Sequence, residues 1–255
     1  MRRLVLDTLV IAERNLIRLP RAPELLLAFT VQPIMFVLLF RYVFGGAIKV
    51  PGNVPYVDFL LPGIIVQNIA FGGFVTALGL NEDVHKGLID RFRSLPMARP
   101  AVLAGRTFSD VVTNLISVTV LLVTGLIIGF SFHTSVLHVI AGIGLLLLFG
   151  YAFSWFFALL GLLVSSPESA NSVGFIAVFP LTFISSAFVP VQTMPSVLRA
   201  FANVNPFTII VDAMRALWIG TPAGNYVWGA LVWAIVILAV FAPLAVARYR
   251  RAAGH

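Results

Sequence analysis

The feature that most constrains this chain is a set of long stretches without a single charged residue. Residues 111–167 contain no Asp, Glu, Lys or Arg, and residues 25–40, 59–81, 169–198 and 216–247 are equally free of charge. A helix that crosses a lipid bilayer needs about 20 consecutive, mostly apolar residues. The charge-free stretches therefore predict several membrane crossings.

The composition agrees with a membrane protein, because 60% of the 255 residues are hydrophobic and only 11% are charged. Soluble domains carry about 25% charged residues. The crossings should be helices, since lipid cannot satisfy an open strand edge and the runs lack the alternation of barrel strands. We predict an all-α integral membrane protein, with residues 1–255 as one transmembrane domain. The six predicted spans cover residues 24–44, 58–80, 107–130, 137–164, 168–189 and 226–247.

The distribution of Lys and Arg predicts the orientation, because positively charged loops stay in the cytoplasm. Of the 17 Lys and Arg residues, 13 lie before the first span, between the second and third spans, or after the sixth. Only Arg41, Lys49, Arg199 and Arg215 fall on the opposite side. We expect a multi-pass protein of a bacterial plasma membrane with both termini in the cytoplasm.

The N-terminal segment, residues 1–22, alternates apolar and basic residues before Pro20 and Pro23 interrupt it. This pattern is typical of an interfacial helix that buries one face among lipid headgroups. The alternative is a simple orientation signal with no further role.

The sequence offers no catalytic or metal-binding constellation. The four histidines, His85, His133, His138 and His255, form no HExxH pattern and no cluster with ligand spacing. There is no GxxxxGK[ST] loop, so any ATP that drives transport must be bound by a separate chain. The acidic residues fall at predicted span ends or in loops, which disfavours a proton-driven carrier.

The longest predicted cytoplasmic loop, residues 81–106, contains a short amphipathic segment that ends at Pro96. Leu88, Phe92 and Leu95 share one helical face between charged neighbours. One interpretation is a coupling helix that docks on a soluble partner. The other is a solvated hairpin. The candidate docking residues are Leu88, Asp90, Arg91, Phe92, Arg93 and Leu95.

Polar residues recur on one face of the third span, at spacings of three, four and seven. They either line a translocation path or hold neighbouring helices together, as Ser, Thr and Asn often do in membranes. The same two interpretations apply to two amides of the second span. The candidate path residues are Gln67, Asn68, Asp110, Thr113, Asn114 and Ser117.

After the fifth span, an apolar outer loop extends to about residue 225, and we expect it to form short helices at the outer surface. Asp212 and Arg215 lie three residues apart in this loop and form a candidate ion pair, which we expect to be weak.

An ordered set of motifs resembles the ABC-2 family of ABC transporter permeases, closest to its daunorubicin-resistance-type subunits. The motifs are Gly-Leu-Ile-Asp-Arg-Phe-Arg-Ser-Leu-Pro at 87–96, Leu-Ala-Gly-Arg at 103–106, Ser-Pro-Glu-Ser-Ala-Asn at 166–171, Phe-Val-Pro at 188–190 with Met-Pro at 194–195, Asn-Pro-Phe-Thr at 205–208 and Asp-Ala-Met-Arg at 212–215.

The resemblance implies a permease subunit of an exporter for hydrophobic or amphipathic compounds, such as drugs, antibiotics or lipids. It implies a homodimer, or a pair with a similar permease, and two ABC ATPase subunits docked beneath. Residues 81–96 would be the helix that couples ATP hydrolysis to the permease. ATP and Mg²⁺ would be bound by the ATPase, and this chain would bind no cofactor. The competing classes are a proton-driven drug carrier and a membrane enzyme.

The predicted topology can be tested by labelling, because the chain has no native cysteine. A cysteine introduced as Arg91→Cys should react with a membrane-impermeant maleimide only after the cells are opened. Lys49→Cys should react in intact cells. Labelling of Arg91→Cys from outside intact cells would contradict the topology.

Overall fold

The computed structural model describes residues 8, 11–13, 23–48, 50, 54–85 and 99–252. The described residues form helices and no strand, which confirms the all-α class for this part of the chain. Thr8 and Ile11–Glu13 are helical, whereas the rest of the predicted interfacial helix lies outside the described residues. The predicted coupling residues between 86 and 98 also lie outside them.

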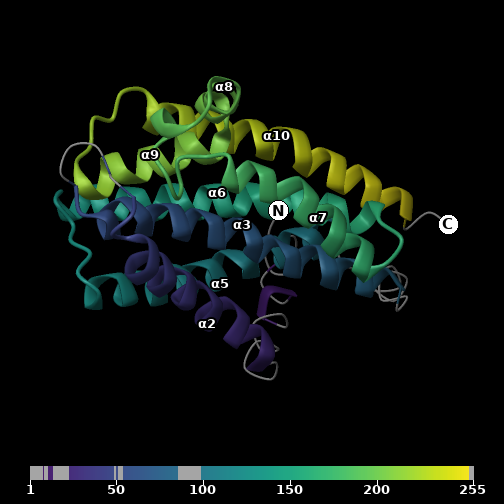
Figure 1. The fold of residues 1–255 in the computed structure, drawn as a ribbon. Helices are drawn as coiled ribbons and strands as arrows, with labels where there is room; N and C mark the ends of the chain where they lie inside the picture. Colours follow the sequence, from purple (N-terminus) through teal and green to yellow (C-terminus); the bar gives the residue numbers. More distant parts are fainter. Residues whose placement is uncertain are drawn as a thin grey trace.

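Ten elements are described, and most of them run along one common direction (Figure 1). In chain order they are α2 (Pro23–Leu39), the π-helix η2 (Phe40–Phe44), α3 (Tyr56–His85), α5 (Arg99–Ile127), α6 (Val136–Leu163), α7 (Pro167–Phe183), the 3₁₀ turn η4 (Val191–Thr193), α8 (Ser196–Val204), α9 (Pro206–Ile219) and α10 (Tyr226–Ala252).

Within this described part, α3, α5, α6 and α10 are each long and apolar enough to cross a membrane. Helices α2 and α7 have only 17 residues each, and α2 continues directly into η2. Helix α3 continues to His85 and α5 begins at Arg99, so regular helix extends into both sides of the predicted cytoplasmic loop.

The core of the bundle lies around α3, of which 21 of 30 residues are buried. Helix α6 packs along α3 and α10, while α2 and α5 cover the opposite side (Figure 1). Large aromatic side chains fill the centre, including the fully buried Phe149, Phe157 and Trp218. Aromatic residues suit this place because each buries a large apolar area.

The segment predicted as an outer loop, residues 190–225, is not confined to the surface. It does contain short helices, but nine of the 14 residues of α9 are buried. Helix α9 packs against α3, α6 and α10 (Figure 1). Its apolar residues between Phe207 and Trp218 recur with helical spacing and supply this buried face.

Helix α9 is hydrogen bonded to other parts of the bundle at both of its ends. Its end is joined to the α5–α6 turn, where the backbone N–H of His133 donates to Trp218 O at 2.9 Å. Its beginning is joined to the end of α7, because Asn205 Nδ2 donates to Leu181 O at 2.7 Å and to Ile184 O at 2.8 Å. Asn205 Oδ1 also accepts from Phe207 N, which caps α9.

The lengths of the two helices agree with one discontinuous crossing. At 1.5 Å per residue, α7 is about 26 Å long and α9 about 21 Å, so together they are slightly longer than α6, at about 42 Å. The helix that begins the predicted fifth span ends at Phe183, and residues 184–205 separate it from α9.

Candidate functional site

A groove of about 490 Å³ lies between α2, α3 and α7. Among the described residues, no charged side chain lines it. Six phenylalanines and four amides contribute most of its surface. The lining residues are Gln32, Pro33, Phe36, Ile64, Gln67, Asn68, Phe71, Gly72, Phe74, Val75, Asn171, Phe175, Phe179 and Phe183. Such a surface offers apolar contact with a few hydrogen-bonding groups, as ligand sites in proteins commonly do.

Stacked rings form one wall of the groove along α7. The ring centroids of Phe175 and Phe179 are 4.8 Å apart, and those of Phe179 and Phe183 are 4.2 Å apart. The row continues from Phe183 to Phe188 at 5.1 Å and from Phe188 to Phe40 at 4.7 Å. Phe188 is buried and connects the ends of α7 and α2.

The predicted path residues separate into two groups. Gln67 and Asn68 line the groove, as one of their two interpretations requires. The candidate residues of α5 do not line the groove. Asp110 accepts from Thr76 Oγ1 of α3 at 2.5 Å, whereas Thr113 donates to Ser109 O of its own helix at 3.1 Å. These contacts favour the interhelical interpretation for α5, and its role in a path stays a prediction.

Asn114 and Ser117 follow the same pattern. Both are buried. A Cβ atom added to Gly150 of α6 would come within 2.8 Å of Asn114, and one added to Gly72 of α3 within 3.2 Å. The asparagine therefore fills the space that two glycines leave between three helices, where an interhelical amide is well placed.

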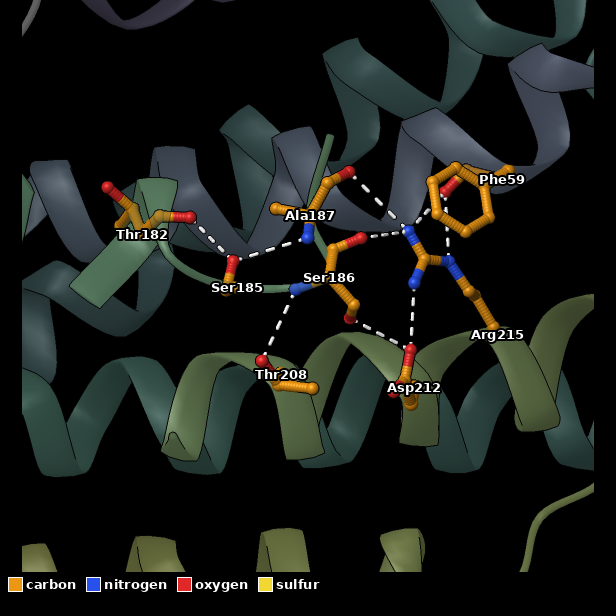
Figure 2. Close-up of polar contacts among 8 residues, drawn as sticks. All are labelled: Phe59, Thr182, Ser185, Ser186, Ala187, Thr208, Asp212 and Arg215. Carbon is orange, nitrogen blue, oxygen red and sulfur yellow. Dashed lines mark hydrogen bonds and ion pairs between the residues drawn. The ribbon is translucent and has the colours of Figure 1, made fainter. Parts of the chain in front are cut away.

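Arg215 of α9 lies at the centre of a buried polar cluster (Figure 2). Its side chain is only 4% exposed. Nε and Nη2 donate to Phe59 O at 3.0 and 2.8 Å, and Nη2 also donates to Ser186 O at 2.7 Å. Nη1 pairs with Asp212 at 2.8 Å, and the guanidinium carbon lies 3.5 Å from the centroid of the Phe59 ring.

Asp212 and Arg215 are thus in contact, but their environment differs from the weak surface pair that the sequence indicates. Desolvation makes each contact of a buried charge more important than it is in water. Asp212 also accepts from Ser186 Oγ at 2.9 Å, and Thr208 Oγ1 accepts from Ser186 N at 3.2 Å (Figure 2).

The cluster holds a strap, residues 185–188, against α3. Arg215 binds the strap by donating to Ser186 O, and Ala187 of the strap contacts Gly63 of α3. A Cβ atom at Gly63 would lie 2.2 Å from Ala187 O, so only glycine permits this approach. Because Phe188 ends the strap and packs against Phe183, the cluster also fixes a ring beside the groove.

Apolar helices around an uncharged groove define the class of a membrane transport protein, and comparisons with known proteins agree. Residues 7–219 match the model of the ABC-2 type transporter family. The chain belongs to this family.

Named relatives include transporters associated with drug resistance. The chain is 36% identical over 233 residues to the daunorubicin resistance ABC transporter permease protein of Streptomyces coeruleorubidus, covering 91% of this chain and 82% of the relative. It is 27% identical over 252 residues to the probable doxorubicin resistance ABC transporter permease protein of Mycobacterium tuberculosis, covering 98% of this chain and 91% of the relative. A probable multidrug ABC transporter permease of Escherichia coli is 25% identical over 207 residues.

The buried cluster predicts a large difference between two Arg→Lys substitutions. Arg215→Lys should cost about 3 kcal/mol or more, because a lysine cannot replace the planar fork that binds Phe59 O, Ser186 O and Asp212 together. Arg199→Lys is the control, since Arg199 donates to Gln192 O and Met194 O close to the surface and should cost about 1 kcal/mol. Thermal unfolding in detergent measures both. Equal losses of stability in the two variants would contradict the proposed role of Arg215 in holding these three groups together.

Proposed function

We propose that this chain is the transmembrane permease subunit of an ABC exporter. It moves a hydrophobic or amphipathic compound, drug-like or lipid-like, out of the cell, and a separate nucleotide-binding subunit hydrolyses the ATP. The observation that carries the proposal is the uncharged groove of phenylalanines and amides along α7, in a chain of the ABC-2 type transporter family. The names of the relatives point to drug export, and family membership argues against a proton-driven carrier or a membrane enzyme.

The proposal includes six crossings with both termini in the cytoplasm. Helices α3, α5, α6 and α10 supply four of them. We assign the first to α2 together with η2, and the fifth to α7 together with α9. Joining α9 to α7 explains how a 17-residue helix can belong to a complete crossing.

The groove is proposed as half of the translocation path. Its α7 wall is open, since Phe175 is 47% exposed and Phe179 is 38% exposed. A second permease copy, or a similar permease, would close this open side. Rings of Phe175, Phe179 and Phe183 would stack on flat parts of a substrate, and Gln67, Asn68 and Asn171 would bind its polar groups.

Helix α7 is proposed as the moving element. Only four of its 17 residues are buried, against nine of 14 in α9, so α7 has far less contact to lose when it tilts. The strap between them is held to α3 by Arg215. Tilting of α7 would separate Phe183 from Phe188 and open the groove beside Phe183.

The dependence on a separate ATPase is testable by reconstitution. The pure chain should hydrolyse no ATP, and co-expression with its ATPase should give ATP-dependent efflux of doxorubicin, the compound in the name of a relative. Phe92→Ala should reduce both co-purification and efflux, because losing a buried anchor costs about 2 kcal/mol or more. Arg93→Ala is the control, with a milder effect that grows at low salt. ATP hydrolysis by the pure chain would contradict the separate ATPase. Normal co-purification and efflux with Phe92→Ala would contradict docking through Phe92.

The groove predicts which exposed phenylalanines matter for transport. Phe179→Ala should raise the KM for doxorubicin efflux about threefold or more, the scale of one lost aromatic contact. Phe108→Ala is a matched control, because Phe108 on α5 is 43% exposed and does not line the groove. Expression levels should be the same for both. If the two variants transport alike, the substrate does not follow the α7 wall.

A further inference from the structure

The end of α3 near the predicted cytoplasmic side is hydrogen bonded to the turn between α6 and α7. Asn81 Nδ2 donates to Gly161 O at 3.1 Å and to Val164 O at 2.8 Å. One helical turn further, His85 Nε2 donates to Ser165 O at 2.8 Å, since a carbonyl oxygen only accepts. Two side chains of α3 therefore bind one carbonyl in the last turn of α6 and two carbonyls in the turn that follows it.

These bonds cap the end of α6, whose last carbonyls have no partner within their own helix. The two backbones are already in direct contact beside the cap. A Cβ atom on Gly161 would lie 2.4 Å from Ala77 O, so α3 and α6 touch one turn before Asn81. The end of α3 and the end of α6 thus form one closely packed unit.

The turn is also joined stiffly to α7. Helix α7 begins at Pro167, whose ring fixes the first backbone angle. Ser166 Oγ accepts from Ser169 N at 3.2 Å and caps the helix. Any displacement of residues 164–166 therefore moves the beginning of α7, the helix that forms the aromatic wall of the groove.

Within the described part of the chain, the side chain of Asn81 has one buried polar atom without a hydrogen bond, which lowers the stability of the fold. The residue is 1% exposed, and among the described residues no donor reaches its Oδ1 atom. A buried acceptor without a partner is destabilising. Because a leucine would fill the same space without this cost, the two bonds from Nδ2 are the contribution that distinguishes asparagine here.

From this arrangement we propose that Asn81 and His85 are positioning residues that transmit movement from the ATPase-docking loop to α7. The inference rests on the proposed function, in which the residues directly after α3 contact the ATPase. A displacement of the α3 end is passed through Asn81 and His85 to the α6–α7 turn, and from there to the groove. Without these bonds, the ATPase still docks and hydrolyses ATP, but the displacement of the α3 end no longer moves α7.

The test uses the complex of the full chain with its ATPase and a reporter that needs no substrate. Asn171→Cys places a thiol in the groove of a chain without native cysteine. In the variant that carries only Asn171→Cys, ATP with vanadate should change the rate at which a maleimide labels this thiol. His85→Ala should reduce that change about fivefold, the ratio that corresponds to one hydrogen bond. His85→Gln keeps a donor and should retain most of the change.

Controls separate transmission from folding and docking. His138→Ala removes a histidine that bonds Ser135 at the opposite end of α6, and it should leave the change intact. Asn81→Leu should reduce the ATP-dependent change in labelling rate as much as His85→Ala does. Because the His85 side chain is exposed, the His85→Ala substitution should leave the fold unaffected. Co-purification with the ATPase and ATP hydrolysis should stay normal in His85→Ala.

The outcomes are distinct. A full ATP-dependent change in both His85→Ala and Asn81→Leu would overturn the inference alone. Loss of co-purification in His85→Ala would also overturn it, because the residue would then act in docking. A background complex in which ATP never alters the labelling would remove the proposed function and this inference together.

Discussion

The guanidinium group of Arg215 is the interaction on which the rest of the structure depends. It holds the first turn of α3, the strap 185–188 and α9 together through Phe59 O, Ser186 O and Asp212. A helix that breaks inside a membrane protein exposes carbonyl oxygens that lipid cannot satisfy. In many transporters such carbonyls bind ions or substrate. Here a side chain of the same protein binds Ser186 O and Ala187 O, so the proposed fifth crossing can be discontinuous while these carbonyls stay bonded.

The break divides the crossing into two halves with different anchoring. Helix α9 is built into the core beside α3, α6 and α10. Helix α7 has most of its surface outside the core and carries the aromatic wall of the groove. A fixed half and a weakly anchored half, joined at Asn205 and Phe188, provide a physical basis for a groove that opens and closes. The bonds from α3 to the α6–α7 turn connect the far end of the weakly anchored half to the predicted cytoplasmic loop.

Much of the helical content follows from the sequence, because charge-free stretches have few alternatives in lipid. The sequence predicts an outer loop where α9 lies, because Asp212 and Arg215 interrupt its apolar run. Arg215 can be buried because Phe59 O and Ser186 O, which are distant in sequence, accept its hydrogen bonds, while Asp212 is half-buried and also accepts from Ser186. The same holds for Asn205, whose role as a cap for two helices requires knowledge of where α7 ends.

The candidate site was only partly predictable for a similar reason. Gln67 and Asn68 stand out as amides in an apolar helix, and they do line the groove. Phe175, Phe179 and Phe183 recur every four residues, a signal that is present in the sequence but is common in any apolar helix. The polar face of α5 has the same periodicity as a path, and only its contacts with α3 and α6 show where it lies. The predicted docking residues between 88 and 95 lie outside the described residues.

The central claim is that α7 moves while the rest of the bundle, anchored through Arg215, stays in place. The most direct test is the distance between spin labels at Ile176 on α7 and Ile235 on α10, two exposed positions. It should be measured in the complex with the ATPase, with and without ATP and vanadate, beside a reference pair at Val123 and Ile235. The claim predicts that the first distance changes with nucleotide and the reference distance does not. An unchanged α7 distance in a complex that transports would contradict it.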